Sequence, residues 1–334
     1  MTTEPAQSAA APSPTFGEAD VDRLAETFEA VHRNVSHVVE GKPEVVRLAL
    51  LTLLSEGHVL LEDVPGVGKT LLAKALARSI NCSVRRVQFT PDLLPSDITG
   101  VTVYDQERGD FEFKPGAVFA NIVLGDEINR AGPKTQSALL EAMEERQVTM
   151  DGRTHELGVP FMVIATQNPI ELDGTYPLPE AQRDRFMTRL EIGYPSADAE
   201  LDILRLHGAG GRLEELSPVT TAHRVAELIE LVKRVHADPS LERYVVEVVR
   251  ATRDHELVEL GASPRAGLAL LRGARALAAA SSREYVTPDD VKELAEPVLA
   301  HRLMLGPDAE LAGHGAAAIV SDVLRQVPIP SGRR

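Results

Sequence analysis

An apolar run, a turn with two glycines and a helical segment follow one another at residues 58–80, and this succession constrains the fold most strongly. Residues 58–64 (HVLLEDV) form a nearly continuous apolar run of strand length, whereas residues 68–80 (GKTLLAKALARSI) have the pattern of a helix. A strand that passes through a glycine-containing turn into a helix opens an α/β unit. The chain is therefore predicted to build a sheet covered by helices.

Four further strand candidates follow within the first 200 residues, at 84–89, 121–126, 161–166 and 190–194. They lack strict alternation of apolar and polar residues, as parallel strands buried on both faces do. Apolar residues at helical spacing over 22–39, 44–56 and 134–145 supply the covering layers. These elements predict an αβα sandwich around a five-stranded parallel sheet.

Two segments interrupt this alternation of strands and helices. Residues 101–113 (VTVYDQERGDFEF) and 147–157 (QVTMDGRTHEL) each alternate in polarity on both sides of a polar centre. The second turns at Asp151-Gly152, a dipeptide that favours the tight turn of a β-hairpin. We therefore expect two hairpin insertions in the sheet-containing part of the chain.

The length of 334 residues predicts one large domain and a smaller one, because a single hydrophobic core rarely grows beyond about 300 residues. The strand pattern ends near residue 210, and segments rich in alanine and leucine with helical spacing follow. We place the boundary in the glycine-rich segment 207–211. The expected organisation is a disordered tail at 1–19, an α/β core at 20–210 and an all-α domain at 211–334.

The turn at residues 63–70 (DVPGVGKT) has the residue types of a loop that binds phosphate groups. In such a loop, backbone N–H groups and the N-terminus of the following helix attract the anion. Lys69 would reach the β- and γ-phosphates of a nucleoside triphosphate, and Thr70 would ligate magnesium. Asp63 stands where the common form of the loop has glycine. The residues expected to bind the nucleotide are Asp63, Pro65, Gly66, Val67, Gly68, Lys69, Thr70 and Leu71.

Polar residues follow two other strand candidates. Asp126 and Glu127 come at the end of one, where an Asp can hold magnesium and a Glu can polarise the attacking water. Asn168 follows another, and its amide is expected near the γ-phosphate because the ends of parallel strands share one edge of the sheet. Taken alone, Asp-Glu is a solvated loop start and Asn a turn former. The phosphate-binding loop upstream favours the functional interpretation of all three.

The chain resembles the MoxR family of AAA+ ATPases over residues 60–194, in the runs GHVLLEDVPGVGKTLLAKALA, GDEINRAGPKTQSALLEAMEERQVT and IATQNPIELDGTYPLPEAQRDRFM. Asp63 is itself a variant that this family uses. The resemblance implies an ATP-hydrolysing, magnesium-dependent AAA+ core followed by a helical lid. It also implies the two insertions of the clade that includes magnesium chelatase and the replicative MCM helicases, and the hairpin candidates fall where these belong.

The resemblance also assigns roles to arginines. AAA+ rings share each ATP between neighbouring copies, and an arginine of the next copy can stabilise the charge on the γ-phosphate. Arg185 matches the family's position for this arginine finger, with Arg183 as the alternative; either could instead form surface ion pairs. Arg265 is similar to the second sensor, which contacts the γ-phosphate, either in its own copy or in the neighbouring one.

The resemblance further implies a homo-oligomer, with a hexameric ring expected. Its partners would be a protein with a von Willebrand factor A domain and client proteins that are remodelled, matured or supplied with a metal or cofactor. Two other functions stay open: a nucleic-acid motor of the same clade, and an ATP-binding scaffold without hydrolysis. The net charge of −15 and an aromatic content of 4% disfavour the motor. The filled catalytic positions disfavour the scaffold.

Location is also suggested by composition. The single cysteine, Cys82, excludes an internal disulfide and is compatible with a reducing compartment. No window reaches the roughly 18 consecutive apolar residues of a membrane span. The first residues lack the positive and apolar regions of a secretory signal. We therefore expect a cytoplasmic protein without direct membrane insertion.

Overall fold

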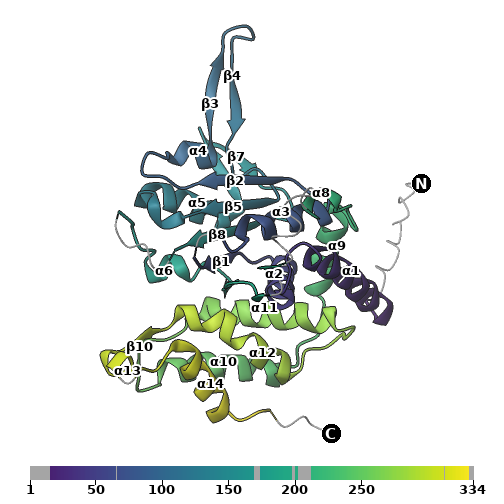
Figure 1. Cartoon of the computed structure of the whole chain (residues 1–334), viewed down its shortest axis with the longest axis vertical. Helices are drawn as coiled ribbons and strands as arrows, with labels where there is room; N and C mark the ends of the chain where they lie inside the picture. Colours follow the sequence, from purple (N-terminus) through teal and green to yellow (C-terminus); the bar gives the residue numbers. More distant parts are fainter. Residues whose placement is uncertain are drawn as a thin grey trace, which may run out of the picture.

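A parallel sheet of five strands forms the centre of the larger part of the molecule (Figure 1). The structure is a computed structural model that describes residues 16–64, 66–168, 174–197, 200–201, 212–311 and 313–330. The strands are β1 (Val59–Glu62), β2 (Val84–Gln88), β5 (Ile122–Asp126), β8 (Met162–Gln167) and β9 (Thr188–Leu190). They lie in the order β2-β5-β8-β1-β9, and all neighbouring pairs are parallel. The predicted sheet is confirmed.

Helices cover both faces of the sheet. Successive strand residues point to opposite faces, and Leu60 and Leu61 of β1 accordingly belong to two different cores, both fully buried. Leu61 packs in a core with α1, α2 and α3, and Leu60 packs in a core with α4 and α5. These helices are α1 (Glu18–Ser36), α2 (Pro43–Leu54), α3 (Lys69–Ser79), α4 (Pro95–Thr99) and α5 (Pro133–Glu145). The αβα sandwich follows from this double burial.

The last strand of the sheet lies earlier than the sequence predicted. β9 pairs residues 188–190 with residues 59–61 of β1, whereas a strand was expected at 190–194. Beyond β9, the N–H of Gly193 donates to the carboxylate of Asp63 at 2.6 Å, and Gly193 has a φ of +65°. A residue with this φ leaves the extended region. The prediction of a strand at 190–194 was therefore wrong.

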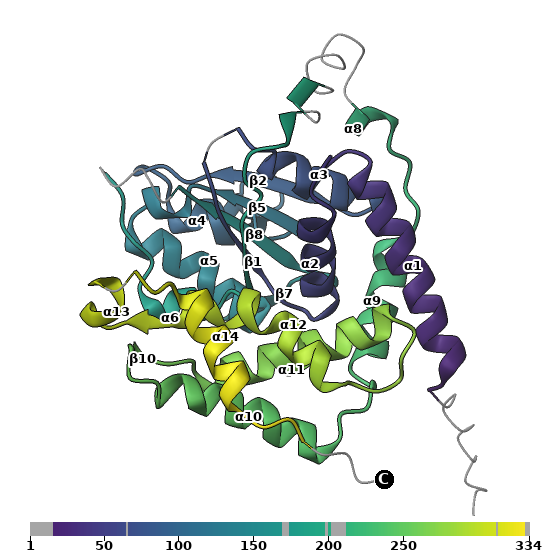
Figure 2. The same ribbon diagram turned by 60° about the horizontal axis from the view of Figure 1, so that its bottom comes forward.

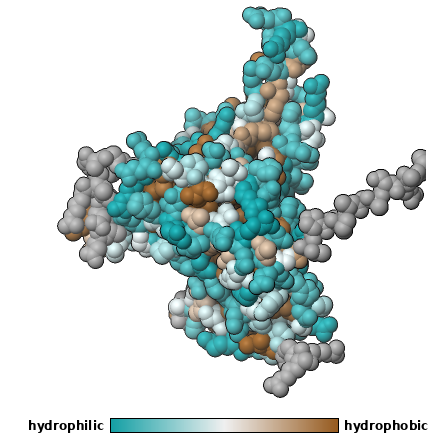
Figure 3. Space-filling model, turned by 90° about the vertical axis from the view of Figure 1, so that its right-hand side faces the viewer, coloured by the Kyte–Doolittle hydropathy of each residue, from teal (hydrophilic) through white to brown (hydrophobic). Residues whose placement is uncertain are grey.

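Both segments with alternating polarity form antiparallel hairpins. β3 (Gly100–Asp105) pairs with β4 (Asp110–Pro115) and stands out from the body of the molecule (Figures 1 and 3). β6 (Gln147–Met150) pairs with β7 (Arg153–Glu156) between α5 and β8. Its two turn residues, at positions 151 and 152, have φ values of +50° and +75°, as the tight hairpin turn requires.

The C-terminal part consists mainly of helices, which lie against one side of the sheet-containing part (Figure 2). They are α9 (Ala222–Val232), α10 (Pro239–Arg253), α11 (Pro264–Ala280), α12 (Pro288–Leu299), α13 (Pro307–Leu311) and α14 (Ala316–Gln326). A short antiparallel ribbon of β10 (Val258–Leu260) and β11 (Met304–Leu305), which the sequence did not signal, joins them. α11 packs against α1 and α2. None of the described helices has both the length and the apolar composition needed to cross a bilayer.

Two limits of the expected organisation fall at or beyond the edges of the described residues. The proposed boundary at 207–211 and residues 1–15 of the proposed tail lie outside them. Helix α1 begins at Glu18, so helical structure starts inside the segment assigned to the tail.

Arg302 fastens the C-terminal helices to the sheet-containing part. Its side chain is 2% exposed, and its Nε donates to Asp184 Oδ1 at 2.8 Å. The same guanidinium donates to the carbonyl oxygens of Phe186 at 2.7 Å and Met187 at 3.1 Å. Because a buried charge needs a partner and several hydrogen bonds, this network fixes residues 184–187 on the helical domain.

His58 joins three elements at the start of β1. It is buried, its Nε2 lies 3.1 Å from the carbonyl oxygen of Met143 in α5, and its Nδ1 accepts the N–H of Val163 in β8 at 3.0 Å. An accepting Nδ1 requires the neutral imidazole. Burial lowers the pKa of His58 to about 4.

We expect acid to destabilise the fold through His58. Histidine in the unfolded chain has a pKa near 6.5, so the unfolded state takes up the proton first. The stabilisation that neutral His58 contributes is present in full above that pH. As the pH drops from there toward 4, the free energy of unfolding falls by on the order of 1 kcal/mol per pH unit for this group. Urea unfolding at several pH values should show a shallower pH dependence in His58→Gln than in wild type. The exposed His223→Gln is the control, and an unchanged slope in His58→Gln would contradict the assignment.

Candidate functional site

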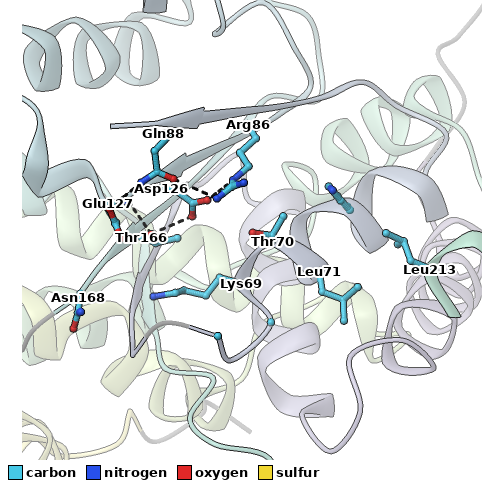
Figure 4. A pocket seen from close by; sticks show the side chains of 13 residues that line it. Lys69, Thr70, Leu71, Arg86, Gln88, Asp126, Glu127, Thr166, Asn168 and Leu213 are labelled. Carbon is cyan, nitrogen blue, oxygen red and sulfur yellow. Dashed lines mark hydrogen bonds and ion pairs between the residues drawn. The ribbon is translucent and has the colours of Figure 1, made fainter. Parts of the chain in front are cut away.

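A cavity of about 430 Å³ opens at the edge of the sheet where β1, β5 and β8 end (Figure 4). The glycine-containing turn after β1 and the start of α3 form one wall, and the ends of β2, β5 and β8 form another. Its lining residues are Gly66, Gly68, Lys69, Thr70, Leu71, Lys74, Arg86, Gln88, Asp126, Glu127, Thr166, Asn168 and Leu213. Residues from five separate parts of the sequence therefore meet in one space.

The turn between β1 and α3 has a backbone that only glycine adopts easily. Gly66 and Gly68 have φ values of +88° and +98°, and no atom lies within 4 Å of a Cβ placed on either. Backbone conformation rather than crowding explains these two glycines. Gly68 is the N-cap of α3, so the first N–H groups of an 11-residue helix face the turn. Pro65, also predicted to bind the nucleotide, lies outside the described residues.

Asp63 has a different place from the other residues of the loop. It is 5% exposed and does not line the cavity. Its carboxylate accepts the N–H of Val64 at 2.8 Å and that of Gly193 at 2.6 Å. The carboxylate thus ties the start of the loop to the segment after β9, which glycine at this position could not do.

Lys69 reaches back across the loop. Its Nζ donates to the carbonyl oxygen of Asp63 at 2.7 Å, and its side chain points into the cavity (Figure 4). Burial lowers the pKa of Lys69, and the carboxylates of Asp63, Asp126 and Glu127 act in the opposite direction. The ammonium group is therefore a cation held partly out of water, where its attraction to an anion is strengthened.

Asp126 is buried at the end of β5 and has two side-chain partners. Arg86 Nε donates to its Oδ2 at 2.5 Å, and Thr166 Oγ1 donates to its Oδ1 at 3.3 Å. Thr166 Oγ1 also accepts the N–H of Glu127 at 3.0 Å. The threonine hydroxyl in β8 therefore fixes the two consecutive acidic residues relative to each other.

The Glu127 side chain is held at the edge strand. Its Oε2 accepts from Gln88 Nε2 at 2.8 Å and lies 3.2 Å from Arg130 Nε. Its φ of +57° is in the left-handed region, where a side chain other than glycine is strained. Asn168 follows β8 directly and lines the same cavity (Figure 4). The positions predicted from the strand ends thus share one space.

Several lining residues were missed by the sequence reasoning. Arg86 and Gln88 are two residues apart on β2, so strand periodicity would have placed both on one face. Thr166 stands two residues before Asn168 and carried the same signal of a strand end. Leu213 lies more than twenty residues after the last strand of the sheet, β9, and no local pattern indicated it.

A second, apolar cavity of about 440 Å³ adjoins the first and shares Gly66, Gly68, Leu71 and Leu213 with it. Val67, which was predicted to bind the nucleotide, lines this second cavity. The remaining lining residues are Val38, Val39, Glu40, Lys42, Ile192, Gly193, Pro195 and Arg212. The turn after β1 therefore separates a polar cavity from an apolar one.

The predicted arginines lie elsewhere. Arg185 and Arg265 line neither of these cavities but a third one of about 240 Å³, between α5 and the start of α11. Arg183 lies in α6 (Glu180–Arg183), 3.9 Å from Glu180. Within the described residues, none of these three arginines lines the cavity at the phosphate-binding turn of its own chain.

The donors in the first cavity fit a magnesium-bound polyphosphate. Thr70 and Asp126 offer a hydroxyl and a carboxylate, the oxygen ligands that magnesium prefers. The helix N-terminus, the open glycine turn and Lys69 offer N–H groups and positive charge to phosphate.

Comparisons with known proteins agree with this arrangement. Residues 58–188 match the ATPase family associated with various cellular activities (AAA), and residues 250–323 match the AAA lid domain. A solved structure of a candidate ATPase from Cytophaga hutchinsonii superposes with a TM-score of 0.87 at 40% identity, covering 94% of this chain and 98% of that one. The fold of core and lid is therefore that of AAA+ ATPases.

Relatives extend over nearly the whole chain. The chain is 52% identical to the uncharacterised protein YeaC of Bacillus subtilis, over 90% of this chain and 94% of YeaC. It is 42% identical to Chaperone MoxR1 of Mycobacterium tuberculosis, over 95% of this chain and 86% of that protein. It is 32% identical to Protein MoxR of Paracoccus denitrificans, over 91% of this chain and 96% of that protein. Because this similarity runs through both the sheet and the lid, the chain belongs to the MoxR family of AAA+ ATPases.

Proposed function

We propose that this protein hydrolyses ATP with magnesium at the interface between two of its copies and uses the cycle to remodel client proteins. One observation carries the hydrolytic part of the proposal. Lys69, Thr70, Asp126, Glu127 and Asn168, which come from three separate segments, line a single cavity of about 430 Å³.

Each of these residues has a definite task in the proposed reaction. Lys69 and the N–H groups at the start of α3 hold the phosphates, and Thr70 and Asp126 hold magnesium. When bound, magnesium neutralises charge on the phosphates. Glu127 polarises the attacking water, and Asn168 orients it relative to the γ-phosphate. Arg86, which donates a hydrogen bond to Asp126 at 2.5 Å, orients that carboxylate.

The apolar cavity beside the loop suits the nucleobase. It shares Gly66 and Leu71 with the polar cavity, so a nucleotide can extend from one into the other. Val38 and Ile192, both buried, supply apolar surface for a planar ring. Such a pocket favours a base mainly through burial of apolar surface.

The charge that develops on the γ-phosphate requires a further cation. We assign this task to Arg185 and Arg265 of the neighbouring copy, because both line a cavity separate from their own phosphate-binding loop. This assignment implies a closed ring in which each interface holds one nucleotide, with six copies as the expected number.

The remodelling part of the proposal is supported by family membership. A relative with 42% identity is named Chaperone MoxR1. We propose a partner that contains a von Willebrand factor A domain and clients that are matured, assembled or supplied with a metal or cofactor. Co-purification of such a partner, followed by faster ATP turnover in its presence, would support this. A partner that co-purifies but leaves turnover unchanged would contradict the coupling.

Glu127→Gln should abolish turnover while leaving nucleotide binding intact. The amide keeps the size of the side chain and its contact with Gln88 but cannot polarise water, so kcat should fall by about a hundredfold or more. Phosphate release measures the rate, and a fluorescent ATP analogue measures binding. Glu191→Gln, an exposed change outside the site, is the control. Turnover within a factor of about two of wild type would remove the role assigned to Glu127.

Complementation between two inactive variants should reveal the shared site. Lys69→Ala lacks phosphate binding in its own loop, and Arg185→Ala lacks the cation that it gives to a neighbour. An equimolar mixture should regain up to about a quarter of the wild-type rate, the fraction of random interfaces that combine an intact loop with an intact arginine.

The matched control for this experiment is a mixture of Lys69→Ala with Glu127→Gln. Both of these changes damage the copy's own loop side, so no interface in that mixture is complete. Recovery in both mixtures, or in neither, would contradict the assignment of Arg185 to the neighbouring copy.

A further inference from the structure

The cavity around Arg185 and Arg265 is a concentrated cluster of positive charge. It lies between the end of α5, residues 184–187 and the start of α11, and its volume is about 240 Å³. Among the described residues, five arginines and three carboxylates line it, which leaves a surplus of two positive charges. They are Arg146, Arg185, Arg265, Arg272 and Arg302, with Glu56, Glu144 and Asp184.

Two of the five arginines are already committed to structural contacts. Arg146 pairs with the carboxylate of Glu56 and also donates to its carbonyl oxygen at 2.6 Å. Arg302 is buried and pairs with Asp184. One lining carboxylate therefore remains to balance the charge of three guanidinium groups, those of Arg185, Arg265 and Arg272.

That carboxylate belongs to Glu144, which binds two of the three arginines. Its Oε2 lies 3.1 Å from Arg185 Nη2, and its Oε1 accepts a hydrogen bond from Arg265 Nη2. The two arginines come from different parts of the chain, one after α6 and one in the first turn of α11. Glu144 therefore holds them side by side with one oxygen for each.

This contact is not needed to hold the lid in place. The Glu144, Arg185 and Arg265 side chains are 34%, 29% and 43% exposed, and ion pairs at this exposure contribute little to stability. The segment of Arg185 is fixed independently, because Asp184 accepts from Arg302 at 2.8 Å and from Ser263 at 2.8 Å. The carboxylate of Glu144 instead neutralises a cluster that would attract another anion.

We propose that Glu144 is a built-in counter-ion which the terminal phosphate of a nucleotide on the neighbouring copy displaces from Arg185 and Arg265. This inference rests on the proposed sharing of each nucleotide between two copies. A terminal phosphate carries about two negative charges and three acceptor oxygens, so it offers Arg185 and Arg265 more charge and more acceptors than the single carboxylate of Glu144 does. Glu144 is thus a positioning residue that keeps both arginines together and sets the ATP concentration at which copies engage.

Glu144→Gln should lower the concentration of a non-hydrolysable ATP analogue that gives half-maximal association of the copies, by about threefold to tenfold. The amide keeps the size of the side chain but no longer competes for two exposed ion pairs. Sedimentation velocity measures association, and the KM for ATP should fall with it while kcat stays near wild type. Glu247→Gln, an exposed change on α10 outside this cavity, is the control.

Three further arms make the outcome decisive. The proposal for Glu144 is overturned if Glu144→Gln needs the same analogue concentration as wild type for half-maximal association while Arg185→Ala weakens association. If Arg185→Ala leaves association unchanged as well, the shared site itself fails. Inorganic phosphate should not promote association, and line broadening of its phosphorus signal should show weak binding to the nucleotide-free protein. Tight, Arg185-dependent binding of free phosphate would overturn the assignment to a neighbouring nucleotide.

Discussion

The parallel pairing of β5, β8 and β1 is the constraint on which the rest of the molecule depends. Parallel strands end at the same edge of a sheet, so Asp126, Asn168 and the turn after β1 come together although they are far apart in the sequence. The pairing is maintained because both faces of these strands are buried, one under α1, α2 and α3 and the other under α4 and α5. The cavity is therefore a consequence of the sheet.

Two separate surfaces of the molecule each suit an anionic ligand. At the edge of the sheet, Asp126 and Glu127 lie near Lys69 and Arg86, and a magnesium-bound polyphosphate would complete this balance. Between α5 and the lid, arginines exceed carboxylates, and an anion would complete the balance there. One helix links the two places, since α5 follows Glu127 by a short turn and carries Glu144 near its end. In a ring, one bound nucleotide would contact the loop of one copy and the arginines of the next.

The sequence predicted the features that local chemistry determines. The sheet, the turn with Gly66 and Gly68 and both hairpins follow from residue types within short windows, and their positions agree with the structure to within a few residues. Features set by distant partners were missed. The strand expected at 190–194 ends at Leu190, and beyond it Gly193 leaves the extended conformation and donates to Asp63, more than 120 positions away.

The same reason explains the residues of the cavity that were not predicted. Arg86 acquires its place only when β2 pairs with β5 beside Asp126, and Leu213 only when the chain returns to the loop after the sheet is complete. A lone arginine in a strand or a lone leucine in a helix has no distinctive local pattern. Only the position of these residues in the folded structure shows that they line the cavity. Family resemblance indicated Arg185 and Arg265, but the competing contact of Glu144 required the packed structure.

The most direct measurement is a crystal structure of the protein with magnesium and a non-hydrolysable ATP analogue. We expect the phosphates at the N-terminus of α3 against Lys69, the metal on Thr70 with Asp126 beside it, and Asn168 facing the γ-phosphate. A nucleotide bound elsewhere, or one whose metal is held without Thr70 and Asp126, would contradict the claim that these three segments form a single ATP site.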